Sequence, residues 1–139
     1  MNLSCYIGAP QLSVMRSACR GEEGEYFRAM IAQLKATIQG MPKTYETDGQ
    51  GDEALATLHY FTPSSDWWIV EKDAGGPDDE TPGAQLQAFG LACLNGDWQN
   101  AESGYISIHE LIAHGAELDL YFTPQTVGAI KVRRKERRA

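Results

Sequence analysis

The sequence predicts an α+β domain with a mainly antiparallel sheet of about four to five strands, one long N-terminal helix over about residues 22–39, and short C-terminal helices. Three observations lead to this prediction. An amphipathic helical repeat lies near the N-terminus, several short β-like segments separated by Gly, Pro, Asn and Asp follow it, and helix signals return near the C-terminus. For this order of elements we expect the helices to pack on one face of the sheet.

The helix over about residues 22–39 is predicted from one apolar stripe at helical spacing. Glutamates in the first turn favour the positive end of the helix dipole, and Gly40 with Pro42 ends the helix. The stripe consists of Phe27, Met30, Ile31, Leu34 and Ile38. We assign no secondary structure to residues 1–20. Pro10 interrupts them, and residues 12–15 fit either a short helix or a segment that only fills the core.

Several short segments have the pattern of strands. Residues 54–61 alternate between two faces, and residues 67–72 are rich in aromatic and β-branched side chains. A short turn-forming stretch separates the two, which indicates an antiparallel hairpin. Residues 85–94 predict a third strand, and shorter strands are expected at residues 104–106 and 118–122.

Two helix starts are expected in the last third of the chain. Ser107 and Glu110 have the spacing of a capping box, in which each side chain satisfies a free backbone N–H of the other residue, and Gly115 ends the brief helix that follows. Thr123 and Pro124 predict the N-cap and the first position of a terminal helix that runs into the basic tail.

Length and charge predict a single globular domain over residues 1–130 and a basic tail over residues 131–139. A chain of 139 residues with 42% hydrophobic residues fills one core. The net charge is −7, yet half of the 12 Lys and Arg residues lie in the tail, and 18 of the 19 acidic residues precede it. The tail is either a solvated terminus or a contact for nucleic acid or an acidic partner, through Lys131, Arg133, Arg134, Lys135, Arg137 and Arg138.

The sequence lacks the patterns of export and membrane insertion. No stretch approaches the ~20 consecutive apolar residues of a membrane span, and the N-terminus has no basic region followed by an apolar core. We therefore expect a cytoplasmic protein. Cys5, Cys19 and Cys93 form no CxxC motif, so we expect reduced thiols.

The histidines give weak evidence for a metal site. His109 and His114 lie five residues apart, whereas the zinc-protease motif HExxH needs four so that both rings share a helix face. Residues 48–53 combine glycines and carboxylates but complete neither a calcium loop nor a phosphate loop. We therefore expect no metal, no cofactor and no catalytic residue. The alternative is a small metal-dependent enzyme that uses a histidine and a carboxylate from among His59, His109, His114, Glu71, Asp73 and Glu110.

Two features predict a surface for a protein partner. Adjacent strand residues point to opposite faces, so a core that covers one sheet face would leave one of Trp67 and Trp68 outside. Burial of both beneath helices and loops is the alternative. Acidic residues gather in two turn-rich segments, 48–53 and 73–83. The predicted partner-binding residues are Asp48, Asp52, Glu53, Trp67, Trp68, Asp78, Asp79 and Glu80.

Short motifs follow one another over about residues 44–124. They are Thr44-Tyr45, Asp48-Gly49-Gln50-Gly51, His59-Tyr60-Phe61, Trp68 with Glu71 and Asp73, Phe89-Gly90-Leu91, Gly104-Tyr105-Ile106-Ser107 with Glu110, and Leu118 with Phe122-Thr123-Pro124. Their order and spacing resemble a small uncharacterised family of bacterial, plasmid and phage proteins, a domain of unknown function. The resemblance brings no catalytic residue and implies an accessory protein of a mobile element. The acidic segment 74–83 is longer than the resemblance implies.

The leading hypothesis is a non-enzymatic interaction protein of a mobile element that inhibits a host nucleic-acid-handling defence complex, such as a CRISPR effector or a restriction enzyme. Carboxylates of the acidic body would take the place of phosphates in a basic groove, which gives strong but salt-sensitive attraction. The alternatives are the metal-dependent enzyme and a nucleic-acid binder that uses the basic tail.

Overall fold

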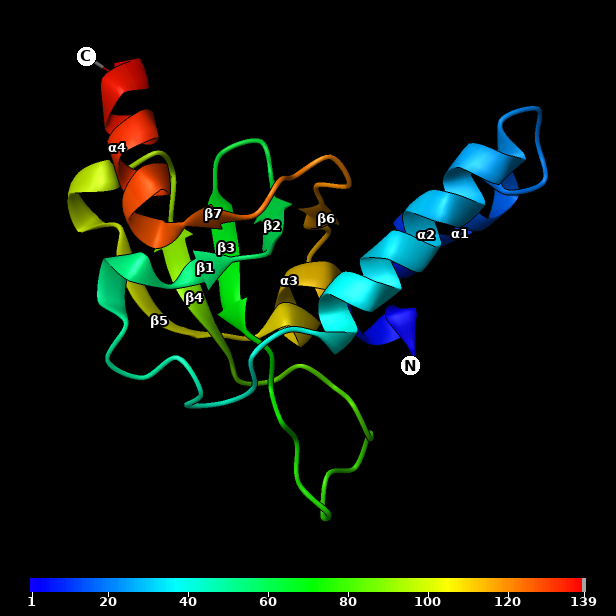
Figure 1. The fold of residues 1–139 in the computed structure, drawn as a ribbon, viewed down its shortest axis with the longest axis horizontal. Helices are drawn as coiled ribbons and strands as arrows, with labels where there is room; N and C mark the ends of the chain where they lie inside the picture. Colours follow the sequence, from blue (N-terminus) through cyan, green and yellow to red (C-terminus); the bar gives the residue numbers. More distant parts are fainter. Residues whose placement is uncertain (139) are drawn as a thin grey trace.

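A computed structural model describes residues 1–138, with side chains described up to residue 134. Two N-terminal helices extend to one side of an antiparallel sheet, and a further helix lies at the C-terminus (Figure 1). The helices are α1 (Ala9–Ala18), α2 (Gly24–Gln39), α3 (Ile108–Ala113) and α4 (Val127–Arg138), and the 3-10 turns are η1 (Leu3–Cys5), η2 (Gly51–Glu53) and η3 (Trp98–Asn100). The strands are β1 (Leu55–Ala56), β2 (Leu58–Phe61), β3 (Asp66–Glu71), β4 (Ala88–Cys93), β5 (Glu102–Ile106), β6 (Glu117–Leu118) and β7 (Gln125–Thr126).

The strands form two sheets. The main sheet has the order β5-β4-β3-β2-β6, and a small sheet pairs β1 with β7. Each of these strand pairs is antiparallel, and β2 and β3 form the predicted hairpin. The α+β class and the antiparallel sheet are therefore confirmed. None of the helices described here has both the length and the apolar character needed to span a membrane.

Two strand predictions need correction. The predicted strand over residues 54–61 is split at Thr57: β1 leaves the main sheet to pair with β7, while β2 stays beside β3. The predicted strand over residues 118–122 ends at Leu118, because Asp119 turns the chain. The Oδ1 atom of Asp119 accepts a hydrogen bond from the backbone N–H of Tyr121 at 3.0 Å, which is an Asx turn.

The helical predictions are confirmed in part. Residues 24–39 form α2, but α1 precedes it, so the N-terminal region contains two helices. Pro10 does not break α1 because it lies in the first turn, where a missing N–H costs no hydrogen bond. Ser107 caps α3, since its Oγ accepts from the Glu110 N–H at 3.1 Å.

Thr123 and Pro124 do not begin the terminal helix. The chain continues into β7, and Thr126 caps α4 by accepting a hydrogen bond from the N–H of Ala129 at 3.2 Å. The predicted boundary between the domain and its basic tail, at residues 130 and 131, falls inside α4. Lys131 pairs with Asp52 at 2.9 Å, so the first basic residue of the tail contacts the acidic body. The side chains of Lys135, Arg137 and Arg138 lie outside the described residues.

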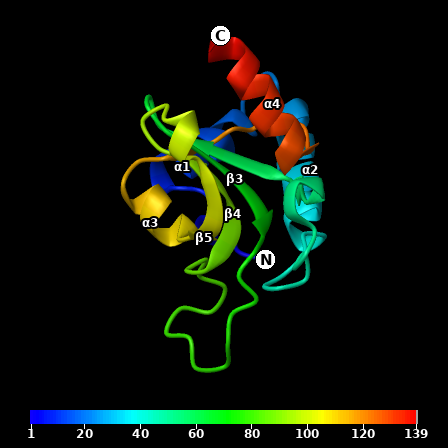
Figure 2. The ribbon, with the colours of Figure 1, turned by 90° about the vertical axis from the view of Figure 1, so that its left-hand side faces the viewer.

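Apolar side chains cover both faces of the main sheet rather than the single face that we predicted. Alternate residues of a strand point to opposite faces, and β3 contributes to two cores. One core contains Ile69 with residues of α1, α2 and α3, and the other contains Trp68 and Val70 with α4. Figure 2 shows α3 and α4 on opposite sides of the central strands. A strand buried on both faces gives β3 its nearly continuous apolar sequence.

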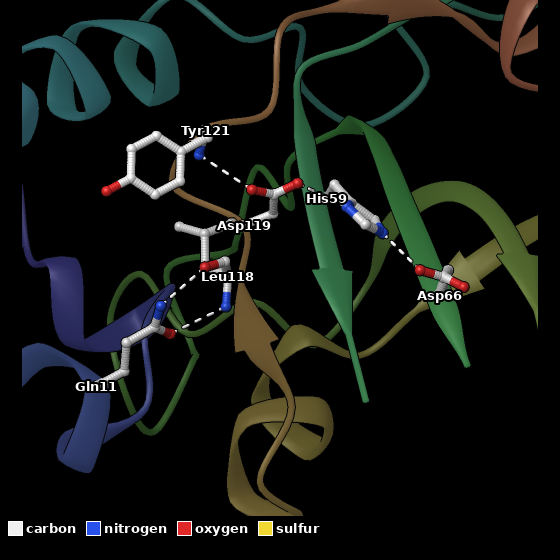
Figure 3. Close-up of polar contacts among 6 residues, drawn as sticks. All are labelled: Gln11, His59, Asp66, Leu118, Asp119 and Tyr121. Atoms are coloured by element: carbon white, nitrogen blue, oxygen red, sulfur yellow. Dashed lines mark hydrogen bonds and ion pairs between the residues drawn. The ribbon is translucent and has the colours of Figure 1, made fainter. Parts of the chain in front are cut away.

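Gln11 closes one edge of the main sheet (Figure 3). Its side-chain Nε2 donates to the Leu118 carbonyl at 2.8 Å, and the Leu118 N–H donates to its Oε1 at 2.9 Å. The amide group thus pairs with the N–H and the carbonyl of Leu118, as a neighbouring strand would. This contact also ties α1 to the sheet.

Gly90 of β4 lies close to the backbone of β3. A Cβ atom at this position would lie 1.9 Å from the Trp68 carbonyl oxygen, which is too short for any contact. Gly104, which is directly opposite on β5, has no atom within 4 Å of the corresponding position.

Gly90→Ala is therefore expected to lower the free energy of unfolding by about 3 kcal/mol or more, because the added methyl group meets backbone that cannot rotate away. Gly104→Ala is the matched control and is expected to change it by less than about 0.5 kcal/mol. Urea unfolding followed by circular dichroism measures both. A similar loss in the two variants would contradict this account of the packing.

Two buried tyrosines stabilise the folded state at pH values at which their hydroxyl groups are protonated. The Tyr60 hydroxyl donates to the backbone carbonyl of Tyr6, and burial raises the pKa of Tyr60 well above 10. Burial, with the nearby charges of Cys5 and Asp73, raises the pKa of Tyr6 to about 12. Because these folded-state pKa values exceed the unfolded value, the folded state is favoured while the phenols stay protonated.

The stabilisation from these tyrosines is expected to be complete below pH 10 and to be lost as the pH rises towards 12. Thermal unfolding between pH 8 and pH 12, with phenolate absorbance recorded in parallel, tests this expectation. Tyr6→Phe removes one of the two groups, so its melting temperature should fall less steeply over this range. An identical pH dependence for the variant and the original protein would show that Tyr6 does not contribute.

Candidate functional site

Three of the predicted partner-binding residues lie on the connection between α2 and β1. Asp48, Asp52 and Glu53 are exposed there, within or beside η2. Asp52 pairs with Lys131, and both side chains of this pair reach solvent. Asp48 lies at the wall of a pocket described below. The structure therefore gathers these three carboxylates on one connection.

The other three predicted carboxylates lie elsewhere. Asp78, Asp79 and Glu80 belong to the long connection between β3 and β4, which projects from the end of the sheet away from α4 (Figure 1). Asp79 is half-buried, and its Oδ2 accepts from the N–H of Gly76 at 2.8 Å within the same loop. This acidic loop is separate from the connection that carries Asp48.

Neither predicted tryptophan is freely exposed. Trp68 is 1% exposed and belongs to the second core. Its ring stacks on His59, and the Arg134 guanidinium lies 5.4 Å from the ring centroid. Trp67 is half-buried and packs against the first core. Trp68 therefore offers no surface to a partner in this structure.

A pocket of about 430 Å³ lies beside the Asp48 connection. We name it the tyrosine pocket. Residues from five segments line it: the α2–β1 connection, the end of β3, strands β4 and β5, and the start of α4. The lining residues that matter chemically are Tyr45, Thr47, Asp48, Glu71, Phe89 and Tyr105.

The Glu71 carboxylate holds one wall of the tyrosine pocket in place. Glu71 is 4% exposed, and its Oε1 accepts from the Tyr45 N–H at 2.8 Å. Its Oε2 accepts from the Thr47 N–H at 2.9 Å and from the Thr47 hydroxyl. A buried carboxylate requires such donors, since an unpaired buried charge costs several kcal/mol. The end of β3 thereby fixes the conformation of residues 45–47.

The backbone of Tyr45 adopts a left-handed conformation with φ of 69°. This region is unfavourable for a bulky side chain and costs on the order of 1 kcal/mol or more. The side chain is nevertheless 68% exposed, so core packing does not explain the choice of tyrosine at this position. Such strain is concentrated at functional sites, where the surrounding structure holds it.

Two tyrosines meet at the opening of the pocket. The Tyr105 hydroxyl donates to the Tyr45 hydroxyl at 3.1 Å, and the Tyr105 ring makes an edge contact with Phe89 at 5.9 Å between centroids. The hydrogen bond with Tyr45 raises the pKa of Tyr105 above its usual value, and desolvation and the charges of Glu71 and Asp48 act in the same direction. The carboxylates thus create a negative potential at the opening.

His59 is the centre of a second polar cluster, which also contains Asp66 and Asp119 (Figure 3), and its ring stacks on that of Trp68. Its Nε2 lies 2.7 Å from Asp66 Oδ1, and its Nδ1 lies 3.1 Å from Asp119 Oδ2. A neutral imidazole donates to one of these carboxylates, whereas the doubly protonated ring donates to both. The cluster connects β2 and β3 to the segment after β6. Because both ring nitrogens are engaged, His59 has no nitrogen left for a metal ion or a substrate.

The other residues of the predicted metal-dependent enzyme do not converge. His109 and His114 are exposed on or at the end of α3, and Glu71 is engaged by residues 45–47. Asp73 accepts hydrogen bonds from the backbone N–H groups of Gly75, Leu86 and Gln87. Among the described residues, no group of three His, Cys, Asp or Glu side chains is arranged to hold a metal ion.

No protein-family model, curated protein or solved structure matches this chain. The residues of the tyrosine pocket themselves therefore carry the functional inference.

Sequence reasoning found Asp48 but did not predict Tyr45, Phe89 or Tyr105 as site residues. These aromatic residues and Glu71 occur among the motifs quoted above, and the structure places them together. Tyr45 and Tyr105 are 60 positions apart in the sequence. No local pattern shows that two residues so far apart share one pocket.

Glu71→Gln is expected to lower the free energy of unfolding by about 2–3 kcal/mol, because an amide cannot accept all the hydrogen bonds that the carboxylate accepts from residues 45–47. Urea unfolding measures the loss, and amide hydrogen exchange at Tyr45 and Thr47 should become faster. The exposed Glu53 provides the control, since Glu53→Gln is expected to change stability by less than about 0.5 kcal/mol. Unchanged exchange at residues 45–47 would contradict the role given to Glu71.

Proposed function

We propose that this protein is a non-enzymatic interaction protein that binds a basic surface of a macromolecular partner through the tyrosine pocket and its acidic rim. One observation carries the proposal: the charged residues that line the pocket, Asp48 and Glu71, are both carboxylates, and exposed tyrosines stand beside them. Tyrosines are enriched at interfaces because they combine a large contact area with a hydroxyl group.

The α2–β1 connection beside the pocket, which we call its acidic rim, adds further negative charge. Glu46, Asp48, Asp52 and Glu53 are exposed on one connection of the chain. Lys131 neutralises part of this charge through its pair with Asp52. Exposed charges each contribute about 1 kcal/mol or less, but several of one sign steer a basic partner towards the surface.

A second cavity, of about 490 Å³, is a weaker candidate for the same role. His59 lines it together with residues of both signs, namely Asp119, Arg133 and Arg134. Mixed charge gives no preference for a basic partner. The tyrosine pocket is therefore the surface that we assign to the interaction.

We extend the proposal to the class of target. A nucleic-acid-handling complex presents a basic groove that accepts phosphates, and carboxylates on a folded protein compete for the same positions. The sequence resemblance implies an accessory protein of a mobile element, and inhibition of such a host defence complex is the role that we propose for it.

The test is binding of a fluorescent oligo-arginine peptide, measured by anisotropy at about 50 mM and about 200 mM salt. Asp48→Asn combined with Glu53→Gln is expected to weaken binding about fivefold to tenfold at low salt, because two attractive charges are lost. Glu22→Gln combined with Glu23→Gln removes the same charge from an exposed site before α2 and should change binding by less than about twofold.

Equal weakening by the two double variants would contradict the proposal, because net charge rather than this surface would then attract the peptide. Weakening by Asp78→Asn with Glu80→Gln, and not by the changes at Asp48 and Glu53, would place the contact on the β3–β4 loop instead. Binding that does not depend on salt would also contradict it.

A further inference from the structure

Three aromatic side chains from different segments line the tyrosine pocket. Tyr45 comes from the α2–β1 connection, Phe89 from β4 and Tyr105 from β5. The Tyr45 and Tyr105 hydroxyls lie 3.1 Å apart, and the rings of Phe89 and Tyr105 pack edge to face. Aromatic faces carry negative partial charge, so a cation held among them is attracted by each ring.

Two carboxylates line the same pocket. Glu71 is nearly fully buried at the wall, and Asp48 is exposed at the rim. Among the residues that the structure describes, no Lys, Arg or His lines the pocket. Aromatic side chains together with carboxylates that have no basic partner among the described lining residues favour a cation over an anion or a neutral apolar group.

The conformation of Tyr45 supports a binding role over a structural one. Glycine would adopt the φ of 69° without strain, whereas a tyrosine ring mostly exposed to water gains little from folding. Glu71 nonetheless holds this residue in place through the Tyr45 N–H. A strained, exposed and firmly positioned aromatic residue is suited to a ligand that packs against it.

We propose that the tyrosine pocket is a recognition site for one lysine or arginine side chain of a partner protein. The proposal rests on the proposed function and states how the basic partner is recognised. The aliphatic stem of the side chain packs against Phe89 and Tyr105, and its charged end lies between the rings and the carboxylates. A volume of about 430 Å³ accommodates such a side chain with the adjoining backbone of the partner.

The test uses small probes, so that one side chain is measured without the rest of a partner. The probes are the blocked amino acids Nα-acetyl-lysine methylamide and Nα-acetyl-arginine methylamide, and the neutral analogue Nα-acetyl-norleucine methylamide. Nuclear magnetic resonance titration is expected to show at least one cationic probe binding with a Kd of roughly 1–10 mM and shifting signals of Tyr45, Phe89 and Tyr105. The neutral probe should bind at least about tenfold more weakly.

Two variants locate the binding. Tyr105→Ala removes one wall and should weaken binding about fivefold. Tyr45→Gly should weaken it similarly while keeping or raising stability, because glycine relieves the left-handed strain, so loss of binding cannot be ascribed to unfolding. Tyr121→Ala is the matched control, since Tyr121 is 71% exposed, as against 68% for Tyr45, and does not line the pocket.

Three results would overturn the inference: equal binding of the neutral probe, retained binding after the combined Tyr45→Gly and Tyr105→Ala changes, or equal weakening by Tyr121→Ala. The proposed function and the inference of a side-chain pocket can be refuted independently of each other. If the oligo-arginine peptide binds through Asp48 and Glu53 but the pocket variants do not alter its affinity, the proposed function is supported. Recognition of a single side chain by the pocket is then refuted. If the small cations bind but the peptide does not, the pocket stands and the interaction with a basic macromolecule does not.

Discussion

Burial of the Glu71 carboxylate is the constraint on which the candidate site depends. A charge at the buried end of β3 needs donors, and residues 45–47 of the α2–β1 connection supply them. This requirement pins the connection to the sheet, holds Tyr45 in a left-handed conformation and brings its hydroxyl to Tyr105. The pocket is thus a consequence of satisfying one buried charge.

Strand β3 makes this arrangement possible because both of its faces are covered. Trp68 and Val70 face the core below α4, and Ile69 faces the core below the N-terminal helices. Gly90 lets β4 approach this strand closely, and β4 in turn carries Phe89 to the pocket. The same two strands, β3 and β4, therefore pack the centre of the sheet and position residues of the candidate site.

Folding brings part of the basic C-terminal segment into contact with the acidic body. The start of the basic segment folds onto the acidic body, where Lys131 pairs with Asp52 and Arg134 lies over the Trp68 ring. Asp48 and Glu71 have no basic side chain beside them among the described residues that line the tyrosine pocket. Partial neutralisation elsewhere leaves this pocket as a place where negative charge and aromatic surface coincide, which is the combination suited to a cationic side chain.

The sequence by itself determined the elements whose signals are local: the helix after Glu22, the hairpin before and after residues 63–65, and the cap at Ser107. It did not determine where Thr57 splits a strand, that Thr126 rather than Thr123 begins α4, or that both sheet faces are buried. Those outcomes depend on which distant segments pair. The same holds for the site, because Tyr45, Glu71 and Tyr105 come together only through strand order and the need to pair a buried carboxylate.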